Sequence, residues 1–344
     1  MDSVDVSFPG FGWTFKVSSV AFKIGGMEIY WYGLIIALGM ILCVAIALRH
    51  CKENKFSQDL IYDILLVSLP SAFVGARLYY VFCEWEYYSA DLRRIFDTRS
   101  GGLAVYGGIA GAFLGAFIML RIRKIPYSTC ADYCIPYIPL GQAIGRWGNF
   151  FNQEAFGTTT NLPWGMTSIT VQNYLKTYCP NLNSSQPVHP TFLYESLWDL
   201  ALFFILLQVR KKSKHAYETT CVYMVGYGVV RFLIEGLRTD SLYIGDTNIR
   251  TSQLLSLILV FVGLLCIILA HYRDTFRVAL PEKCFAAEIA RGASKASVTS
   301  LVEVESKETE SSDDESADEE DNDDEPAEDA AEESQPEEDT ETED

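Results

Sequence analysis

The stretch IYWYGLIIALGMILCVAIAL, residues 29–48, runs for twenty residues without a charged side chain. A hydrocarbon core about 30 Å thick is crossed by a helix of roughly 20 apolar residues, so this run predicts a transmembrane helix. Further apolar runs of similar length follow along the chain, at residues 60–82, 103–120, 130–149, 190–209, 221–237 and 254–270. The sequence therefore predicts an all-α polytopic membrane protein with seven transmembrane helices.

The charge of the chain is concentrated at one end. The 344 residues carry a net charge of −18, but residues 301–344 hold 24 acidic residues and one lysine, which leaves the rest of the chain at +5. No dense basic patch exists to neutralise phosphates, so a nucleic-acid binder is excluded. The nine cysteines and four histidines form no CxxC or HExxH pattern. We therefore expect neither a metal site nor a cofactor.

Loop charge predicts the orientation. Three loops hold 10 Lys/Arg in 32 residues, at positions 49–59, 121–130 and 210–220. The alternate loops hold 6 in 77 residues, at positions 83–102, 150–189 and 237–253. The positive-inside rule places the first set in the cytoplasm. With seven spans, the N-terminus then lies outside and the C-terminus lies in the cytoplasm.

These patterns divide the chain into four expected parts. Residues 1–28 form an extracytoplasmic N-terminal segment, and residues 29–272 form the seven-helix catalytic domain. Residues 273–302 form a cytoplasmic juxtamembrane segment. Residues 303–344 are too acidic and too poor in apolar side chains to fold, so we expect a disordered cytoplasmic tail.

Charged residues inside the predicted spans indicate a polar interior. Each charge is costly in lipid, so each should face a partner or a cavity. The second, fourth, fifth and sixth spans hold such residues, namely Asp63 with Arg77, Asp132 with Arg146, Glu195 with Asp199, and Arg231 with Glu235. Structural ion pairing explains Asp63 and Arg77 equally well. Charges in four spans are harder to explain in that way, and they favour a polar interior cavity.

Two clusters are denser than packing requires. The first is GRWGNFFNQEAFG, residues 145–157, where Arg146 and Asn149 share a helix face. The second is RFLIEGLR, residues 231–238, whose Arg231, Glu235 and Arg238 fall within about 60° on a helical wheel. Arginines oriented by carboxylates suit a phosphate ligand, and a phospholipid headgroup offers one at this depth. A structural arginine network that closes the helix bundle is the alternative.

The first cluster closely resembles the GRxGNFxNxExxG signature of bacterial prolipoprotein diacylglyceryl transferases. Other segments resemble the family in order and spacing, at residues 30–34, 75–80, 101–108, 189–195 and 231–238. The resemblance covers roughly residues 25–272. It implies transfer of a diacylglyceryl group from phosphatidylglycerol to the lipobox cysteine thiol of a prolipoprotein signal peptide, with release of glycerol phosphate. It also implies a plasma- or inner-membrane location with the active site toward the extracytoplasmic face.

The resemblance also implies roles for individual residues. Arg146 and Arg231 match the family's central arginines and would hold the headgroup phosphate and neutralise the charge that gathers on it. Asn149 would hydrogen-bond the headgroup, and Glu154 would orient an arginine or accept a proton. The remaining expected site residues are Glu235, which completes the catalytic set, and the substrate-binding Tyr32, Asn152, Gly157 and Arg238.

One position departs from the family pattern. Many members have a histidine directly before the second glycine pair, where this chain has Tyr106. The acceptor thiol has a reference pKa of about 8.5, and a tyrosine with a reference pKa of about 10 is a poor base for it. Tyr106 is therefore expected to donate a hydrogen bond that positions the headgroup, while the arginines lower the pKa of the acceptor thiol or Glu154 takes its proton. The alternative is that Tyr106 itself is the base. His189 is expected to be a helix-entry residue before Pro190 rather than a substitute base.

Two functions from other classes stay open at the level of sequence. A phospholipid or solute transporter would also carry charges in broken spans, although its sites are expected at the midplane together with an inverted repeat. A seven-span receptor has little support from the short cytoplasmic loops. Cys83 and Cys179, both in predicted outer loops, are candidates for a disulfide.

Overall fold

The computed structural model describes residues 3–54, 56–98, 101–244 and 247–273. The expected acidic tail at residues 303–344, and the expected juxtamembrane segment beyond residue 273, lie outside this part of the chain. Within it, six helices are long and apolar enough to cross a membrane. These helices are α1 (Trp31–Cys51), α2 (Gln58–Cys83), α4 (Val105–Ile122), α8 (Thr191–Lys212), α9 (Glu218–Leu237) and α10 (Thr251–Arg273). The prediction of a polytopic helical membrane protein is confirmed.

The fourth predicted span is broken into two helices. Residues 130–149 contribute to α5 (Tyr127–Cys134) and α6 (Tyr137–Asn152), with Pro136 at the N-cap of α6. Proline lacks the backbone N–H that a continuous helix needs, so the chain breaks there. With 16 residues, α6 is about 24 Å long, which is shorter than a typical hydrocarbon core.

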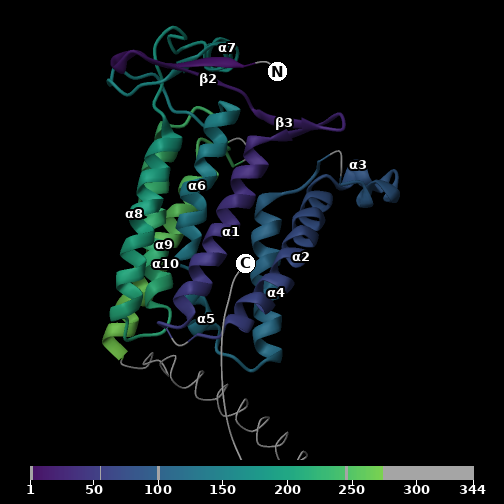
Figure 1. The fold of residues 1–344 in the computed structure, drawn as a ribbon, viewed down its shortest axis with the longest axis vertical. Helices are drawn as coiled ribbons and strands as arrows, with labels where there is room; N and C mark the ends of the chain where they lie inside the picture. Colours follow the sequence, from purple (N-terminus) through teal and green to yellow (C-terminus); the bar gives the residue numbers. More distant parts are fainter. Residues whose placement is uncertain (1–2, 55, 99–100, 245–246, 274–344) are drawn as a thin grey trace, which may run out of the picture. The chain divides into compact units, whose positions relative to one another are not determined.

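Five short strands in the described part of the chain depart from the all-α prediction. β1 (Val4–Phe8) pairs antiparallel with β2 (Trp13–Val17) and with β5 (Thr167–Ser168), in the order β2-β1-β5. β3 (Val20–Ile24) and β4 (Met27–Tyr30) form a separate hairpin. All of these strands, together with α7 (Ile169–Tyr178), lie at one end of the helix bundle (Figure 1), which we name the strand-bearing end.

The long helices form two groups that run between the strand-bearing end and the far end (Figure 1). Helices α1, α6, α8, α9 and α10 pack in sequence, α1 on α6, α6 on α8, α8 on α9 and α9 on α10. Helices α2 and α4 pack mainly on each other. Their close approach requires glycine, because a Cβ at Gly75 would lie 2.5 Å from the carbonyl oxygen of Gly107. The short α3 (Trp85–Ser89) follows α2 at the strand-bearing end (Figure 1).

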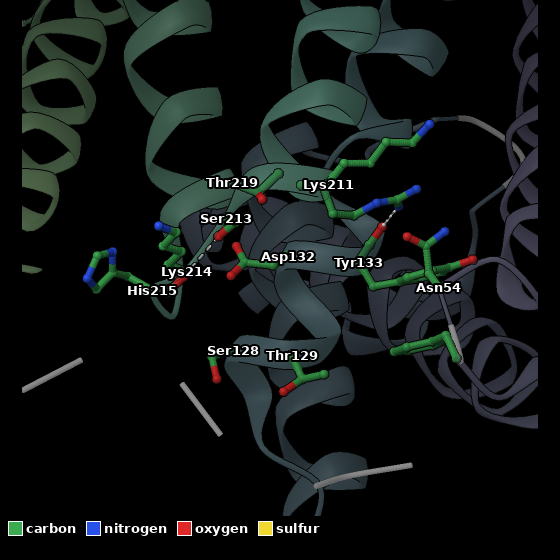
Figure 2. A pocket seen from close by; sticks show the side chains of 12 residues that line it. Asn54, Ser128, Thr129, Asp132, Tyr133, Lys211, Ser213, Lys214, His215 and Thr219 are labelled. Atoms are coloured by element: carbon green, nitrogen blue, oxygen red, sulfur yellow. Dashed lines mark hydrogen bonds between the residues drawn. The ribbon is translucent and has the colours of Figure 1, made fainter. Parts of the chain in front are cut away.

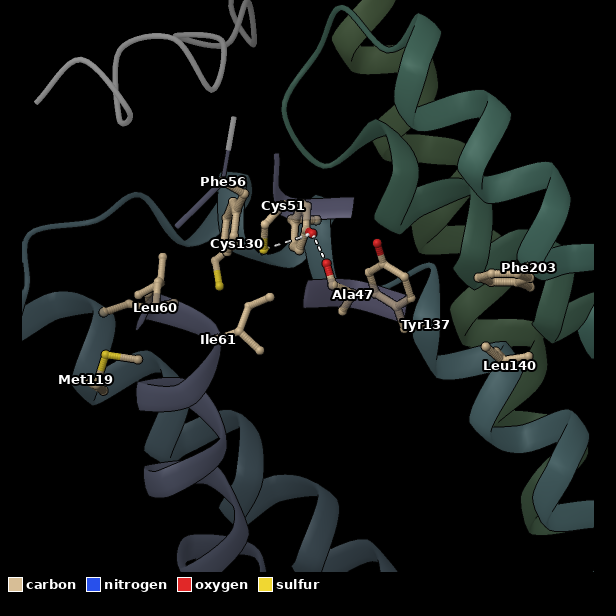
Figure 3. Close-up of a cluster of buried hydrophobic side chains, with 12 residues drawn as sticks. Ala47, Cys51, Phe56, Leu60, Ile61, Met119, Cys130, Tyr137, Leu140 and Phe203 are labelled. Carbon is tan, nitrogen blue, oxygen red and sulfur yellow. Dashed lines mark hydrogen bonds between the residues drawn. The ribbon is translucent and has the colours of Figure 1, made fainter. Parts of the chain in front are cut away.

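An apolar core closes the far end of the bundle (Figure 3). Phe56 stacks on Tyr133 with ring centroids 3.9 Å apart, and both belong to a buried cluster with residues of α1, α2, α4 and α6. The Tyr133 hydroxyl donates to the carbonyl oxygen of Ala47 at 2.6 Å. This cluster packs the two helix groups against each other at the end of the bundle opposite the strand-bearing end.

Candidate active site

Two arginines share one buried glutamate where α6, α8 and α9 meet. Arg146 Nη2 of α6 forms an ion pair with Glu195 Oε2 of α8, and Arg231 Nη1 of α9 lies 2.7 Å from Glu195 Oε1. Arg231 Nη2 also lies 2.8 Å from Glu235 Oε2, one helical turn further along α9. The side chains of Glu195 and Glu235 are almost fully buried. The result is a continuous network of two cations and two anions.

The three helices place these side chains at similar depth. Arg146 and Arg231 each precede the end of their helix by six residues, or about 9 Å, while Glu195 follows the start of α8 by four residues, or about 6 Å. All three helix ends lie at the strand-bearing end (Figure 1). The network therefore lies about 6–9 Å inside that end.

The arginines of the network have donors to spare. A guanidinium carries five N–H donors. Within the described residues, Arg146 is joined only to Glu195, and Arg231 only to Glu195 and Glu235. Both arginines are less than one fifth exposed, so their remaining N–H groups are largely removed from solvent. A phosphate group offers the acceptors that such donors lack.

Arg77 on α2 is the opposite case. Its five N–H groups donate to the carbonyl oxygens of a single loop, those of Arg94, Ile95, Asp97, Gly101 and Gly102, at 2.6–3.0 Å. The expected alternative, an ion pair between Asp63 and Arg77, is wrong, because Asp63 pairs with Arg123 at 2.6 Å. Arg77 shapes this loop and has no donor left for a ligand.

A second polar group lies at the end of α6. The side-chain amides of Asn149 and Asn152 both donate to Glu154 Oε1, at 2.9 and 3.3 Å. Glu154 is exposed, and the described residues provide no arginine partner for it. Two roles were expected for Glu154. No contact in the structure supports the first, which is to orient an arginine, and the second, which is to accept a proton, stays a prediction. The amides fix Oε1 of the carboxylate, and no hydrogen bond from the described residues reaches Oε2.

The expected stripe of Arg231, Glu235 and Arg238 is only partly helical. Helix α9 ends at Leu237, and Arg238 follows it in extended conformation. Arg238 binds both carboxylate oxygens of Asp240, at 2.9 and 2.7 Å. Burial alone would lower the pKa of Arg238, but the carboxylates of Asp240, Glu195 and Glu235 together more than offset it and raise that pKa above its ordinary value. The structure joins Glu235 to the network by an ion pair, whereas the ion-pair partner of Arg238 is Asp240.

Two expected substrate-binding residues shape the backbone around the site. The ring of Tyr32 occupies the space beside Gly148, where an added Cβ would come within 2.6 Å of it. Gly157 donates its N–H to the His189 carbonyl at 2.9 Å, and a Cβ there would lie 2.8 Å from that of His189. Gly157 thus holds the loop after α6 against the entry to α8.

Tyr106 is not joined to the arginine network. It is the second residue of α4 and 45% exposed, and no hydrogen bond within the described residues links it to Arg146 or Arg231. His189 bonds the hydroxyl of Tyr194 at 3.1 Å, as expected for a residue at the helix entry, and burial lowers its pKa. Cys83 and Cys179 are both free thiols, so the disulfide considered for them is absent.

Two cavities differ in character. An apolar groove of about 380 Å³ lies between α1, α6 and α8 and is lined by Trp147 and Ser196, the chain neighbours of Arg146 and Glu195. A polar pocket of about 180 Å³ lies near the far end (Figure 2). There Asp132 accepts from the N–H and hydroxyl of Thr220 at 2.9 and 2.7 Å, which caps α9. The Asp132 carboxylate therefore has a structural role as a cap of α9.

Sequence reasoning did not include Glu195 among the site residues. Glu195 was recognised only as a buried charge in the fifth span, yet it joins the two arginines. Asp199, one turn further along α8, is 2% exposed and lines a small cavity with Glu195 and Arg231. A Glu-x-x-x-Asp pair in one predicted span, in a chain with arginines in two other predicted spans, is the signal that indicates this role.

The fold and this site define a polytopic membrane protein with a network of two arginines and two buried glutamates among its helices. The sequence model of the family described as prolipoprotein diacylglyceryl transferase matches residues 19–269. The chain belongs to this family. It is 47% identical over 247 residues to the phosphatidylglycerol–prolipoprotein diacylglyceryl transferase of Finegoldia magna, which covers 72% of this chain and 93% of that protein.

Other relatives carry the same name. The proteins of Clostridioides difficile and Enterococcus faecalis are each 42% identical, over 246 and 264 residues, covering 72% and 75% of this chain and 92% of each relative. Every expected site residue lies inside the matched region, whereas β1, β2 and the acidic tail lie outside it. The resemblance inferred from the motifs is confirmed, and the transporter alternative is not favoured.

Proposed function

We propose that this chain transfers the diacylglyceryl group of phosphatidylglycerol to the cysteine thiol of a prolipoprotein. The observation that carries this proposal is the Arg146–Glu195–Arg231 network, two arginines held by one shared carboxylate with N–H donors left over. The relatives act, by their names, on phosphatidylglycerol and prolipoproteins.

The network suits the leaving group of this reaction. The thiolate sulfur attacks the glycerol carbon that bears the phosphate, the S–C bond forms, and the C–O bond breaks. The electron pair of the C–O bond stays on the phosphate, which leaves as glycerol phosphate with one more negative charge. Arg146 and Arg231 offset this charge where it develops, and Glu195 keeps both guanidinium groups in place before the lipid arrives. The thioether forms without a covalent enzyme intermediate.

The thiol proton needs an acceptor near the same site. Glu154 fits this role because two amides orient one of its oxygens while the other stays free. Asn149 and Asn152 then act as positioning residues for the carboxylate. Tyr106 keeps the lesser role of a hydrogen-bond donor to the headgroup, since its reference pKa of about 10 makes it a poor base.

The apolar groove beside Trp147 suits the acyl chains of the donor lipid. It lies between α1, α6 and α8 and is lined mainly by apolar side chains. A lipid in this groove would extend along the bundle with its headgroup toward Arg146, which is on the same helix as Trp147. This arrangement would admit the donor from the bilayer rather than from water.

The helix directions support the proposed membrane topology. Helices α5 and α6 together run from the far end to the strand-bearing end (Figure 1), and we propose that they form the seventh crossing. The basic loops at residues 49–59, 121–130 and 210–220 lie at the far end, which the positive-inside rule places in the cytoplasm. The active site then faces the extracytoplasmic side of the plasma membrane, where lipobox cysteines emerge. The N-terminus lies outside, and residues 273–344 follow in the cytoplasm.

One assay tests the proposed function. Purified protein in lipid nanodiscs is incubated with phosphatidylglycerol labelled in its acyl chains and a peptide that carries a lipobox cysteine. The expected result is a labelled thioether peptide together with one glycerol phosphate per transfer, and none with a serine in place of the cysteine. Movement of labelled lipid between leaflets without peptide modification would instead identify a transporter.

A further inference from the structure

The β3–β4 hairpin has two chemically different faces. The pairs Phe22↔Ile29 and Ile24↔Met27 place four apolar side chains on one face. The pair Lys23↔Glu28 lies on the other face, joined by an ion pair of 2.6 Å. The turn between the strands is Gly25-Gly26, both with positive φ, as a two-residue hairpin turn requires.

The apolar face is uncovered within the described residues. Ile24 and Met27 are 58% and 72% exposed, and Phe22 is 40% exposed. None of these side chains belongs to a buried apolar cluster of the described chain. A two-stranded hairpin is at best marginally stable in water, so a face of this kind needs something to cover it.

The hairpin is fixed at the surface of the bilayer by its junction with α1. Tyr30 ends β4 and is also the N-cap of α1, and Trp31 donates its N–H to the Ser19 carbonyl at 2.9 Å at the base of the hairpin. The 21 residues of α1 are about 31 Å long, which matches the hydrocarbon thickness, so the first turn of α1 lies at one membrane surface. The hairpin cannot lie far from that surface.

The orientation of the hairpin also agrees with a surface location. The hairpin extends sideways from the start of α1, across the helix axis rather than along it (Figure 1). Tyr30, Trp31 and Tyr32 follow in sequence at this level, and tyrosine and tryptophan are the residues that favour the membrane–water boundary. Below them, α1 exposes apolar side chains such as Leu38 and Ile41. A hairpin that lies across the helix axis at this level has one of its two faces toward the leaflet.

We propose that the β3–β4 hairpin is an interfacial anchor that docks on the phospholipid leaflet at the strand-bearing end. Phe22, Ile24 and Met27 enter the boundary between headgroups and acyl chains, and the Lys23–Glu28 pair stays in water. The hairpin also borders a cavity of about 530 Å³ that is lined by Tyr32 and Asn152. Docking therefore holds the mouth of this cavity level with the lipid headgroups. The proposal does not depend on the transferase reaction.

Site-directed photo-crosslinking tests this proposal on the full chain in nanodiscs of phosphatidylglycerol and phosphatidylethanolamine. The photoreactive residue benzoylphenylalanine replaces Ile24 or Met27 on the apolar face, and Lys23 or Glu28 on the polar face as matched controls. Mass spectrometry then separates adducts with lipid from adducts with protein. We expect lipid adducts at positions 24 and 27 to exceed those at positions 23 and 28 at least tenfold.

Other outcomes overturn the proposal. Equal lipid adducts on the two faces would show that the hairpin does not lie flat on the leaflet. Crosslinks from positions 24 and 27 to a second copy of the chain would identify a dimer contact as the cover. Crosslinks to an added lipobox peptide would identify the acceptor as the occupant. Thermal stability measured for each variant in the same nanodiscs confirms that all four remain folded.

Discussion

Arg77 and the pair Arg146–Arg231 are all buried arginines in apolar helices, but they are satisfied in opposite ways. Arg77 gives all five donors to backbone carbonyls of one loop. Arg146 and Arg231 are held on one side by Glu195 and keep donors in reserve. The comparison teaches that burial of an arginine says little about its role, whereas the number of its unused donors says much.

We expect the largest loss of transfer activity when Arg146, one of the two arginines with unused N–H donors, is replaced. Arg146→Ala should lower transfer by at least about 10³-fold, because an electrostatic contact to the leaving phosphate is removed. Arg146→Lys should recover little, since a point charge replaces a planar fork. Initial rates with labelled phosphatidylglycerol in nanodiscs measure both variants. Near-normal rates for the lysine variant would argue against paired hydrogen bonds from this residue.

The shared carboxylate comes next. Glu195→Gln keeps the shape but removes the charge that positions both arginines, so transfer should fall by about 10- to 100-fold, the value of one hydrogen bond to a charged group. Glu235→Gln, which affects only Arg231, is the matched control and should lose less. Rates and lipid affinity are measured for both variants. Equal losses in the two would contradict the bridging role of Glu195.

Substitution of Tyr106 should lower transfer less than substitution of Arg146 or Glu195. If its hydroxyl only positions the headgroup, Tyr106→Phe lowers transfer about tenfold, the value of one neutral hydrogen bond. Tyr106→His restores the arrangement common in the family and should stay active. The rate is measured against pH for the three proteins. An inactive phenylalanine variant beside an active histidine variant would instead make Tyr106 the base.

Arg77 should affect stability rather than turnover. Arg77→Ala leaves several buried carbonyls without a donor, each costing about 1–3 kcal/mol, so the melting temperature should fall by several degrees or more. The rate per folded molecule should stay unchanged as long as the loop reforms around the site. Thermal unfolding and active-site titration of the same preparation separate the two quantities. A stable but inactive variant would move Arg77 into the catalytic set.

The smallest expected effect concerns the acidic segment. Deletion of residues 303–344 should leave transfer unchanged, because the segment lies outside the region shared with the family and follows α10, which ends at the far end. Transfer by the truncated protein in native membranes measures this. A large loss at normal insertion would give the segment a part in catalysis.

Composition and periodicity predicted most of the helices but not how they meet. Six apolar runs became helices within a few residues of their predicted limits, whereas the run at residues 130–149 broke at Pro136. The length of an apolar run does not predict where the helix within it is interrupted. The β3–β4 hairpin was missed, although the alternation of VAFKI and MEIY around Gly25-Gly26 is the usual signal for one.

The sequence predicted the two arginines of the site but not the ion pairs that connect them through Glu195. Arg146 and Arg231 could be found because charge is costly in an apolar span. Their common partner Glu195 comes from a third helix, 36 residues from Arg231, and only the packing of α8 against α6 and α9 brings it there. The same limit explains the wrong Asp63–Arg77 pair, since two charges in one span do not reveal which neighbours they face.

The central claim is that the phosphate of one phosphatidylglycerol molecule binds Arg146 and Arg231 at the same time. An experimental structure of the protein with phosphatidylglycerol in nanodiscs tests it most directly. We expect phosphate oxygens within hydrogen-bonding distance, about 2.7–2.9 Å, of both Arg146 and Arg231, with Glu195 still between the two guanidinium groups. A headgroup phosphate bound elsewhere, with Arg146 and Arg231 still joined only to Glu195 and Glu235, would contradict the account.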